Sequence, residues 1–280
     1  MKLIVIGGSG YVGSNLALHM NAEKVAYYSR HKNPVLEKNG IEWIEGSILD
    51  SEKVASAIKD YDTVVDAAGI YKEDEQRFFD VHVSGVKNLV NAINKYDTGQ
   101  RLIYLSAINV HYGQTEFLRT KRTGEDNVAL VKNHLNVRPS LLFGNGDMFT
   151  EKLFRLASSS ISKLPGGGSI SPVHVEDLAK VILGAKDIRG AVDVSSRDRI
   201  SFADAVNIAR KKLGKPELKT VDGKLGYSGS VEKIMETGIF QKYEIERFLT
   251  DLYRENTYLD RFVKEPASFR QYIENFNIKA

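Results

Sequence analysis

Short apolar runs alternate with amphipathic stretches along the first half of the chain. Continuous apolar runs rich in β-branched residues are typical of strands buried on both faces of a parallel sheet. We expect strands at residues 3–6, 24–29, 41–44, 63–67 and 102–105, and a sixth within 135–143 that Pro139 interrupts. Apolar positions recur with a helical period at residues 11–20, 76–95 and 117–131, and Asp50 is placed to cap a further helix.

This alternation of strands and helices, joined by short connections, predicts a doubly wound parallel sheet of the α/β class. The pattern changes after the sequence Gly-Asn-Gly-Asp at 144–147, and from residue 201 onward it is mostly helical. We therefore expect a core at 1–145, with return segments at about 172–200. Residues 146–171 and 201–280 are expected to form a small, mostly helical C-terminal lobe.

Three glycines, Gly7, Gly10 and Gly13, lie between the first strand and the first helix at the spacing G-x-x-G-x-x-G. The first permits a tight turn, the second lets backbone N–H groups approach a pyrophosphate, and the third lets the helix pack closely on the sheet. The helix N-terminus adds partial positive charge. This stretch, which also contains Ser9, Tyr11 and Val12, predicts a Rossmann-type site for a nicotinamide dinucleotide.

The end of the second strand bears on which nucleotide is bound. Many NAD sites place an acid there to accept the ribose hydroxyls. Here the sequence is Tyr-Ser-Arg-His-Lys at 28–32, with no acid. Arg30, with Lys32 beside it, is suited to a 2′-phosphate. We therefore expect NADP(H) in preference to NAD(H), although NAD(H) stays possible and Arg30 could instead stack on adenine or face solvent.

Together these features resemble the extended and atypical short-chain dehydrogenase/reductases. The resemblance spans nearly the whole chain and rests on the segments 7–13, 66–69 (Asp-Ala-Ala-Gly), 81–89, 138–140 (Arg-Pro-Ser) and 172–179. A narrower likeness, to the group of the mitochondrial complex I accessory subunit and its epimerase-like prokaryotic relatives, rests on 105–107 (Leu-Ser-Ala), 117–121 (Phe-Leu-Arg-Thr-Lys), 124–125 (Gly-Glu) and 143–147.

The resemblance implies further cofactor-binding residues. Ser47 stands where family members often have an Asp directed at adenine, with Ile48 beside it. The small residues after the fourth strand would approach the ribose, and residues after the fifth and sixth strands would face the nicotinamide half. The residues expected near the ribose are Ala67, Ala68 and Gly69, and those expected near the nicotinamide half are Leu105, Ser106, Lys121 and Pro139.

The family's usual proton relay is incomplete in this sequence. Active members use a Ser or Thr, a Tyr, and a Lys four residues after the Tyr, and the Tyr exchanges a proton while hydride moves. Lys121 is present, but the position four residues earlier is Phe117, and the hydroxyl position matches Ala107. Phenylalanine has no titratable proton. The protein would then bind the cofactor without the usual turnover, in a structural, assembly or sensing role.

A second interpretation stays open, in which another group supplies the proton. Tyr112 and His111 are the first candidates, followed by Tyr71 and Tyr104. The protein would then be an NADP-dependent oxidoreductase or a sugar-nucleotide epimerase acting on a substrate that the sequence does not identify. His82, where the family commonly has Asn, is expected to be a hydrogen-bonded structural histidine.

The amino-acid composition limits which classes of protein and of functional site are possible. Hydrophobic residues make up 42% and charged residues 27% of the 280 residues, which is typical of a globular protein. The absence of cysteine excludes disulfides and a thiol nucleophile, and the histidines lack a metal-binding spacing. The net charge is +3 and the basic residues are scattered along the chain, so we expect no nucleic-acid partner. No apolar stretch is long enough to span a membrane, and we expect a cytoplasmic protein that could be a homodimer or a complex subunit.

Overall fold

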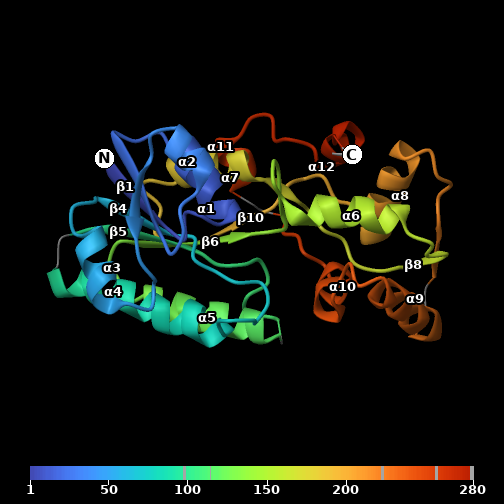
Figure 1. Ribbon diagram of the computed structural model, residues 1–280, viewed down its shortest axis with the longest axis horizontal. Coiled ribbons are helices and arrows are strands. Elements are labelled where there is room, and N and C mark those ends of the chain that lie inside the picture. The colour runs from blue at the N-terminus through green and yellow to red at the C-terminus, as the bar shows by residue number, and fades with distance from the viewer. Residues whose placement is uncertain (97–98, 114, 222–223, 256–257, 278–280) are drawn as a thin grey trace. The chain divides into compact units, whose positions relative to one another are not determined.

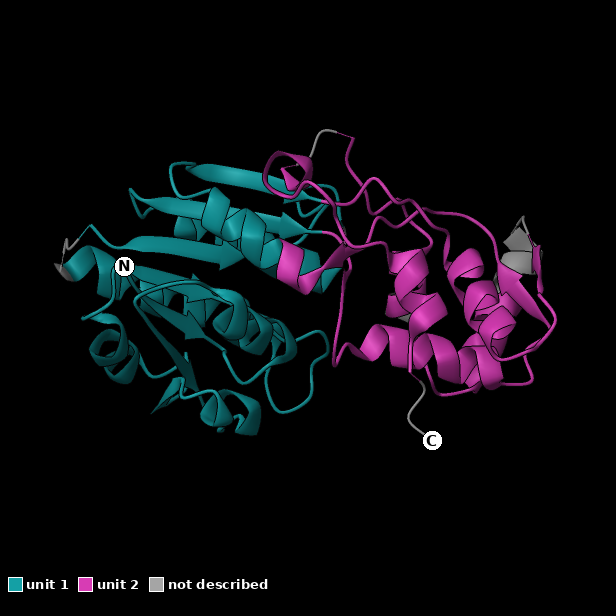
Figure 2. Ribbon diagram, turned by 90° about the horizontal axis from the view of Figure 1, so that it is seen from above, with its two compact units in different colours: residues 1–139, 178–194 teal, residues 140–177, 195–280 magenta. Residues whose placement is uncertain are grey.

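The computed structural model describes residues 1–96, 99–113, 115–221, 224–255 and 258–277. It divides into two compact units, shown in different colours in Figure 2. The first unit consists of residues 1–139 and 178–194, and the second of residues 140–177 and 195–280. The sequence placed the corresponding core at 1–145 with return segments at about 172–200.

A seven-stranded sheet forms the centre of the first unit, and all of its neighbouring strands pair in parallel. In spatial order the strands are β10 (Gly190–Val194), β6 (His134–Pro139), β5 (Arg101–Leu105), β4 (Thr63–Asp66), β1 (Lys2–Ile6), β2 (Lys24–Ser29) and β3 (Glu42–Glu45). The order reverses direction between β1 and β4, which is the switch point where doubly wound sheets bind ligands. The predicted parallel Rossmann sheet is confirmed.

Helices cover both faces of this sheet (Figure 1). One layer holds α3 (Ser51–Ile58), α4 (Val86–Tyr96) and α5 (Glu116–Val128), and the other holds α1 (Tyr11–His19), α2 (Pro34–Lys38) and α7 (Val175–Gly184). Buried aliphatic residues of the strands, such as Ile4 and Val64, pack with Val54 and Leu89 of the first layer in one cluster. This burial explains why the strands read as continuous apolar runs.

Two details of the first unit depart from the sequence pattern. The helix expected at 76–95 contains a π-helical segment, η1 (Asp80–Gly85), before α4 begins. The short helix α2 is absent from the expectation, although Asn33 caps it by accepting hydrogen bonds from the N–H groups of Val35 and Leu36. Asp50 caps α3 as predicted, through a 3.1 Å bond from the Lys53 N–H.

The second unit is mostly helical. Its helices are α6 (Met148–Ser158), α8 (Phe202–Lys212), α9 (Lys224–Glu236), α10 (Lys242–Phe248), α11 (Leu259–Phe262) and α12 (Phe269–Asn275). It also holds two small parallel pairs, β7 (Leu142–Phe143) with β9 (Val173–His174), and β8 (Lys163–Pro165) with β11 (Lys219–Val221). Its core is aromatic: the rings of Phe149 and Phe248 are 4.7 Å apart, and Phe202 stacks on Phe248 at 5.7 Å.

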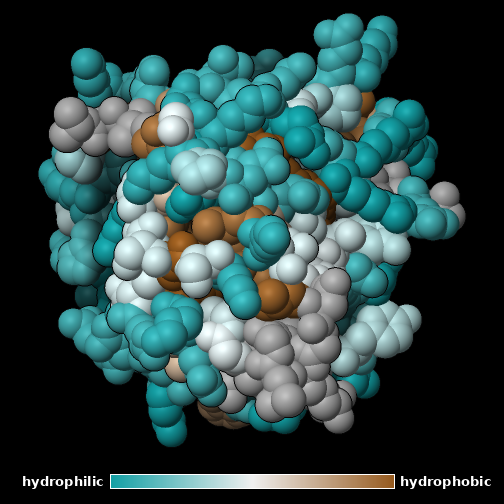
Figure 3. Space-filling view, turned by 90° about the vertical axis from the view of Figure 1, so that its right-hand side faces the viewer, coloured by the Kyte–Doolittle hydropathy of each residue, from teal (hydrophilic) through white to brown (hydrophobic). Residues whose placement is uncertain are grey.

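The face of the molecule seen in Figure 3 has apolar residues near its centre, with residues of intermediate hydropathy beside them and hydrophilic ones farther out. None of the helices in the described part of the chain is long and apolar enough to cross a membrane.

Candidate functional site

The turn between β1 and α1 and the first turn of α1 leave no room for a side chain at Gly7, Gly8 or Gly13. Gly7 has a φ of 75°, and a Cβ there would lie 2.6 Å from the Cα of Ala68. A Cβ on Gly13 would lie 2.4 Å from the Gly7 carbonyl oxygen, so glycine is what lets α1 pack this closely on the turn. Gly10 is the N-cap of α1, where no side chain caps the helix and no acid lies in the first turn. The turn therefore fits a pyrophosphate group.

The backbone carbonyls of Ser9 and Tyr11 accept hydrogen bonds from asparagine side chains. The Ser9 carbonyl accepts a 3.3 Å hydrogen bond from the side-chain amide of Asn33, the residue that caps α2. The Tyr11 carbonyl accepts a 2.8 Å bond from the side-chain amide of Asn15. Tyr11 and Val12 begin α1, so their backbone N–H groups lie at the positive end of the helix dipole.

A pocket of about 180 Å³ lies beside this turn, at the carboxyl ends of β1, β2 and β4. Among its lining residues are most of those expected at the adenosine and pyrophosphate half of a dinucleotide: Gly7, Ser9, Gly10, Arg30, Ser47, Ile48, Ala67, Ala68 and Gly69. Other lining residues were not expected from the sequence, namely Ile6, Tyr28, Ser29, Gly46, Ile70, Gln76 and Val81. Several of these directly follow or end a strand, and that position is the signal that could have identified them.

One side of the pocket, where adenosine is expected, is shaped by Tyr28, which is buried in β2. Its hydroxyl donates a 3.0 Å hydrogen bond to the Ser47 carbonyl. A Cβ on Gly46 would lie 2.1 Å from that hydroxyl oxygen, so glycine is required there. Burial raises the pKa of Tyr28 to about 12, which keeps its hydroxyl a donor. The contact fixes the segment carrying Ser47 and Ile48 against the end of β2.

Arg30 and Lys32 differ in position although both follow β2. Arg30 lines the pocket and is the one residue with an ionised side chain among its lining residues. Lys32 is not among them, because its Nζ forms a 2.9 Å ion pair with Glu37 and lies 5.1 Å from the Trp43 ring. Hydrogen bonding to Glu37 raises the pKa of Lys32. The structure thus brings Arg30, and not Lys32, to the pocket.

Asp66, at the end of β4, is a buried acid that the sequence analysis did not assign to the site. One of its carboxylate oxygens accepts a 3.0 Å hydrogen bond from the Ala68 N–H. Its other oxygen has no hydrogen-bond partner among the described residues. Burial raises the pKa of Asp66 to about 7, although Lys121 opposes that rise. An acid directly after the apolar residues Val64 and Val65 was the signal in the sequence that could have identified it.

Lys121 is buried on α5 and reaches the end of β5. Its Nζ donates a 2.7 Å hydrogen bond to the Leu105 carbonyl and lies 4.7 Å from the centre of the Tyr104 ring. Ser106 is buried next to Leu105, and its N–H donates a 2.8 Å hydrogen bond to the Val137 carbonyl. These residues do not line the pocket described above. They lie at the ends of the neighbouring strands, where the nicotinamide half is expected.

Pro139 ends β6, beside β5, in the same region. Its carbonyl accepts a 3.0 Å hydrogen bond from the Ile108 N–H, which links the two strand ends. Asn109, the next residue, has a φ of 62°, a left-handed conformation that asparagine tolerates better than most residues. The segment following β5 is thereby tied to the end of β6.

Phe117 lies among aromatic rings. It meets the His82 ring edge-on with ring centres 5.5 Å apart, and the Phe78 ring edge-on at 5.8 Å. His82 is fully buried, its Nδ1 lies 3.1 Å from the Thr120 hydroxyl, and its Nε2 accepts a 3.3 Å bond from the Ile70 N–H. Burial, followed by the charge of Lys121, lowers the pKa of His82 to about 2. The histidine is therefore neutral and hydrogen-bonded, as the sequence suggested.

The structure does not gather the alternative proton donors at the pocket. Tyr112 is 75% exposed and Tyr71 is 45% exposed, and neither lines it. The Tyr104 hydroxyl is buried against α5, where a Cβ on Gly124 would lie 2.4 Å from it. Burial also raises the pKa of Tyr104 well above its usual value.

His111 contacts an ion pair instead of the pocket. Its Nε2 lies 2.6 Å from Nη2 of Arg138 and 3.5 Å from a carboxylate oxygen of Glu125. Arg138 and Glu125 are joined by two hydrogen bonds, of 2.8 and 2.5 Å. The imidazole thus anchors the segment after β5 to a largely buried ion pair.

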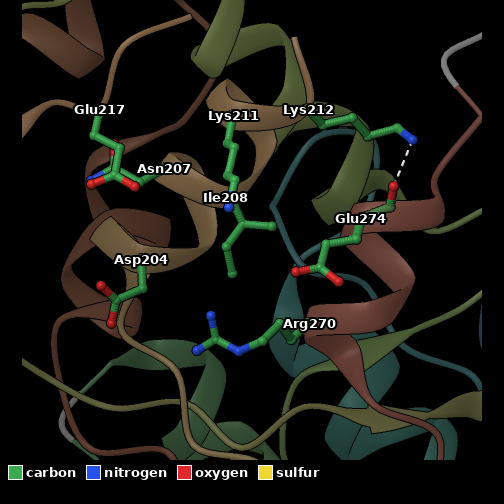
Figure 4. A pocket seen from close by; sticks show the side chains of 8 residues that line it. All are labelled: Asp204, Asn207, Ile208, Lys211, Lys212, Glu217, Arg270 and Glu274. Carbon is green, nitrogen blue, oxygen red and sulfur yellow. Dashed lines mark hydrogen bonds between the residues drawn. The ribbon is translucent and has the colours of Figure 1, made fainter. Parts of the chain in front are cut away.

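A second pocket, of about 500 Å³, lies within the second unit between α8 and α12 (Figure 4). Its charged residues are balanced between bases and acids: Lys211, Lys212 and Arg270 against Asp204, Glu217 and Glu274. Lys212 Nζ donates a 2.6 Å hydrogen bond to the Glu274 carbonyl, drawn as a dashed line. None of the residues expected at the dinucleotide site lines it. In the described part of the chain, no three histidine, aspartate or glutamate side chains cluster as a metal site requires.

Solved structures with the same fold include enzymes crystallised with NAD. dTDP-glucose 4,6-dehydratase from Bacillus anthracis, in complex with NAD, superposes with a TM-score of 0.74 at 17% identity, covering 98% of this chain and 94% of that one. UDP-glucose 4-epimerase from Thermus thermophilus, also in complex with NAD, has a TM-score of 0.65 at 18% identity, covering 94% of this chain and 99% of that one. At these identities the likeness establishes the fold.

Curated relatives have higher identity over shorter stretches. A 3-beta-hydroxysteroid dehydrogenase from Mycolicibacterium neoaurum is 28% identical over 221 residues, 67% of this chain and 56% of the relative. The mitochondrial NADH-ubiquinone oxidoreductase 40 kDa subunit from Neurospora crassa is 27% identical over 162 residues, 56% of this chain and 42% of the relative. The chain thus matches about half the length of these relatives. Because the model of the NAD dependent epimerase/dehydratase family matches residues 3–187, most of the chain, the protein belongs to that family.

Proposed function

We propose that the protein binds a nicotinamide dinucleotide, NADP(H) in preference to NAD(H), and does not turn it over by the proton relay usual in its family. The observation that carries this proposal is Phe117. It stands four residues before Lys121 and packs its ring against His82 and Phe78. A phenyl ring can neither give nor take the proton that carbonyl reduction requires.

The preference for NADP(H) rests on the end of β2. Arg30 is the ionised residue of the pocket lining, and its side chain is 46% exposed, which leaves it accessible to a ligand. A guanidinium can bind a phosphate through two hydrogen bonds. No lining residue offers a carboxylate for the hydroxyls of an unphosphorylated ribose.

The two histidines that could replace the missing phenol already have partners. His82 Nε2 already accepts the Ile70 N–H, and His111 is engaged with Arg138 and Glu125. We therefore favour a structural, assembly or sensing role for the bound nucleotide. The 40 kDa subunit of NADH-ubiquinone oxidoreductase among the relatives supports a role as a complex subunit.

The second candidate is an NADP-dependent oxidoreductase or sugar-nucleotide epimerase. It is favoured by the 3-beta-hydroxysteroid dehydrogenase relative, whose match covers 67% of this chain. In that case Tyr112 or His111 would supply the proton from the segment after β5.

The test combines binding with turnover. We expect mass spectrometry of the purified protein to detect NADP(H), titration to give a lower Kd for NADPH than for NADH, and no NADPH oxidation with a panel of carbonyl compounds. We expect F117Y to gain NADPH oxidation while F78Y, which alters another ring beside His82, does not. Turnover by the unaltered protein that Y112F or H111N abolishes would establish the second candidate instead. If the protein binds neither nucleotide, both candidates are wrong.

A further inference from the structure

A carboxylate lies beside the arginine that is expected to meet the 2′-phosphate. Oε2 of Glu75 is 4.0 Å from Nη1 of Arg30. Glu75 belongs to the loop between β4 and η1, and the next residue, Gln76, lines the dinucleotide pocket together with Arg30. An acid from a separate segment is therefore placed at the adenosine end of the site.

Glu75 differs from the other charged residues of its loop. Lys72 pairs with Asp74 at 3.1 Å, and Arg77 pairs with Asp80 at 3.1 Å. The Glu73 carboxylate accepts a 2.8 Å hydrogen bond from the Phe78 N–H. These contacts stay within the loop and the start of the following helical segment, whereas Glu75 reaches the end of β2.

The contact is too weak to hold the loop in place. The side chains of Arg30 and Glu75 are 46% and 87% exposed, and exposed ion pairs contribute little to stability. A phosphate monoester carries more negative charge than a carboxylate at neutral pH, and it can take two hydrogen bonds from a guanidinium. A 2′-phosphate could thus displace Glu75. The affinity for the phosphate would then be lower, because Arg30 loses its attraction to Glu75 when the phosphate binds.

We propose that Glu75 is a specificity-determining residue, which weakens NADP(H) binding relative to NAD(H) by competing with the 2′-phosphate for Arg30. This rests on the proposed function, in which Arg30 receives that phosphate. NAD(H) has no 2′-phosphate, so its binding leaves the Arg30–Glu75 pair intact. Glu75 therefore narrows the preference for NADP(H) that Arg30 creates.

The test compares E75Q with D74N. Both remove one negative charge from the same loop, but Asp74 pairs with Lys72 and not with Arg30. Titrations with NADPH and NADH at low ionic strength measure both dissociation constants. We expect E75Q to lower the Kd for NADPH about three- to tenfold, the range expected for unit charges about 4 Å apart in water, and to change that for NADH by less than about twofold. D74N should change either value by less than about twofold. In an R30Q background the gain from E75Q should vanish.

Two results would overturn the inference while leaving nucleotide binding in place. An unchanged ratio of the two dissociation constants in E75Q would show that Glu75 has no part in specificity. A loss of NADH affinity in E75Q would show that Glu75 accepts hydrogen bonds from the ribose hydroxyls. If the unaltered protein binds neither nucleotide, the proposed function fails, and this inference fails with it.

Discussion

Lys121 Nζ donates a 2.7 Å hydrogen bond to the carbonyl oxygen of Leu105, the last residue of β5. This bond ties the middle of α5 to the carboxyl edge of the sheet. One helical turn earlier, Phe117 directs its ring to His82. The lysine of the family's usual pair is thus present, and the residue four positions before it is a phenylalanine. Under the proposed function, in which Lys121 binds the nicotinamide ribose and no phenol supplies a proton, such a site is suited to holding a nucleotide.

Substitutions of Lys121 and Arg30 should differ in how they change the affinities for NADPH and for its adenosine half alone. We expect K121M to weaken NADPH binding about 10- to 100-fold, because a hydrogen bond from a charged donor to the nicotinamide ribose is lost. Binding of 2′,5′-ADP, which lacks the nicotinamide half, should change little. R30Q should weaken both ligands. Isothermal titration of each variant with each ligand measures the four constants, and an equal loss of both ligands in K121M would contradict this assignment.

The ion pair between Glu125 and Arg138 should contribute strongly to stability. The Glu125 side chain is 3% exposed and that of Arg138 is 18% exposed. Hydrogen bonding to Glu125 raises the pKa of Arg138. A guanidinium stays charged in proteins even without a carboxylate beside it. We expect E125Q to lower the free energy of unfolding by about 3 kcal/mol, because it leaves a largely buried charge without its counterion.

E116Q is the matched control, since Glu116 also lies on α5 and pairs with an arginine. The side chains of Arg119 and Glu116 are 60% and 53% exposed, so E116Q should cost less than about 1 kcal/mol. Urea denaturation measures both changes. Equal losses in E125Q and E116Q would show that burial does not set the strength of the Glu125–Arg138 pair.

The sequence pattern was sufficient to predict the sheet and the glycine-rich turn between β1 and α1. Runs such as 3–6 and 102–105 are apolar at every position, so each identifies a buried strand without reference to the rest of the chain. The glycine spacing likewise predicts the turn from sequence alone. The steric demands at Gly7 and Gly13 come from residues close in sequence or from the end of the adjacent strand. Arg30 followed from its position at the end of a predicted strand.

Contacts between distant segments could not be predicted in this way. Lys32 resembles Arg30 in charge and neighbourhood, but Glu37 and Trp43 hold it away from the pocket lining. Glu75 lies in a charged loop, and nothing in that loop's sequence indicates its contact with Arg30. The π-helical winding at Asp80–Gly85 was also unpredictable, because the apolar period there resembles that of an ordinary helix.

Gly13 should be intolerant of even one methyl group. A Cβ there would lie 2.4 Å from the Gly7 carbonyl oxygen and 2.9 Å from the Cα of Gly8, both of them backbone atoms that cannot rotate away. We expect G13A to lower the free energy of unfolding by about 2–4 kcal/mol and to abolish nucleotide binding. G229A is the control, because Gly229 is also helical and a Cβ there meets nothing within 4 Å. Thermal unfolding of G229A should occur at or slightly above the Tm of the unaltered protein, and equal losses in the two variants would refute the steric explanation.

Asp66 and His82 should make opposite contributions to the dependence of stability on pH. The pKa of Asp66 is about 7 in the folded protein against 3.8 ordinarily, so the folded state keeps a proton that the unfolded state loses above pH 3.8. The stability that this proton contributes is lost as the pH rises from 3.8 to about 7. The pKa of His82 is about 2 against 6.5, so the unfolded state takes up the proton and stability is lost as pH falls below 6.5. Between about pH 4 and 6.5 the two effects oppose each other.

D66N removes one of these effects and retains an oxygen that can accept the Ala68 N–H. The remaining contribution of His82 should then make the stability of D66N fall more steeply than that of the unaltered protein on acidification from pH 6.5 to 4.5. The added slope is at most about 1.4 kcal/mol per pH unit. D60N, at an exposed aspartate in the first unit, should keep the slope of the unaltered protein. Urea denaturation at several pH values gives these slopes, and a D66N slope equal to that of the unaltered protein would mean that Asp66 is ionised in the folded protein throughout this range.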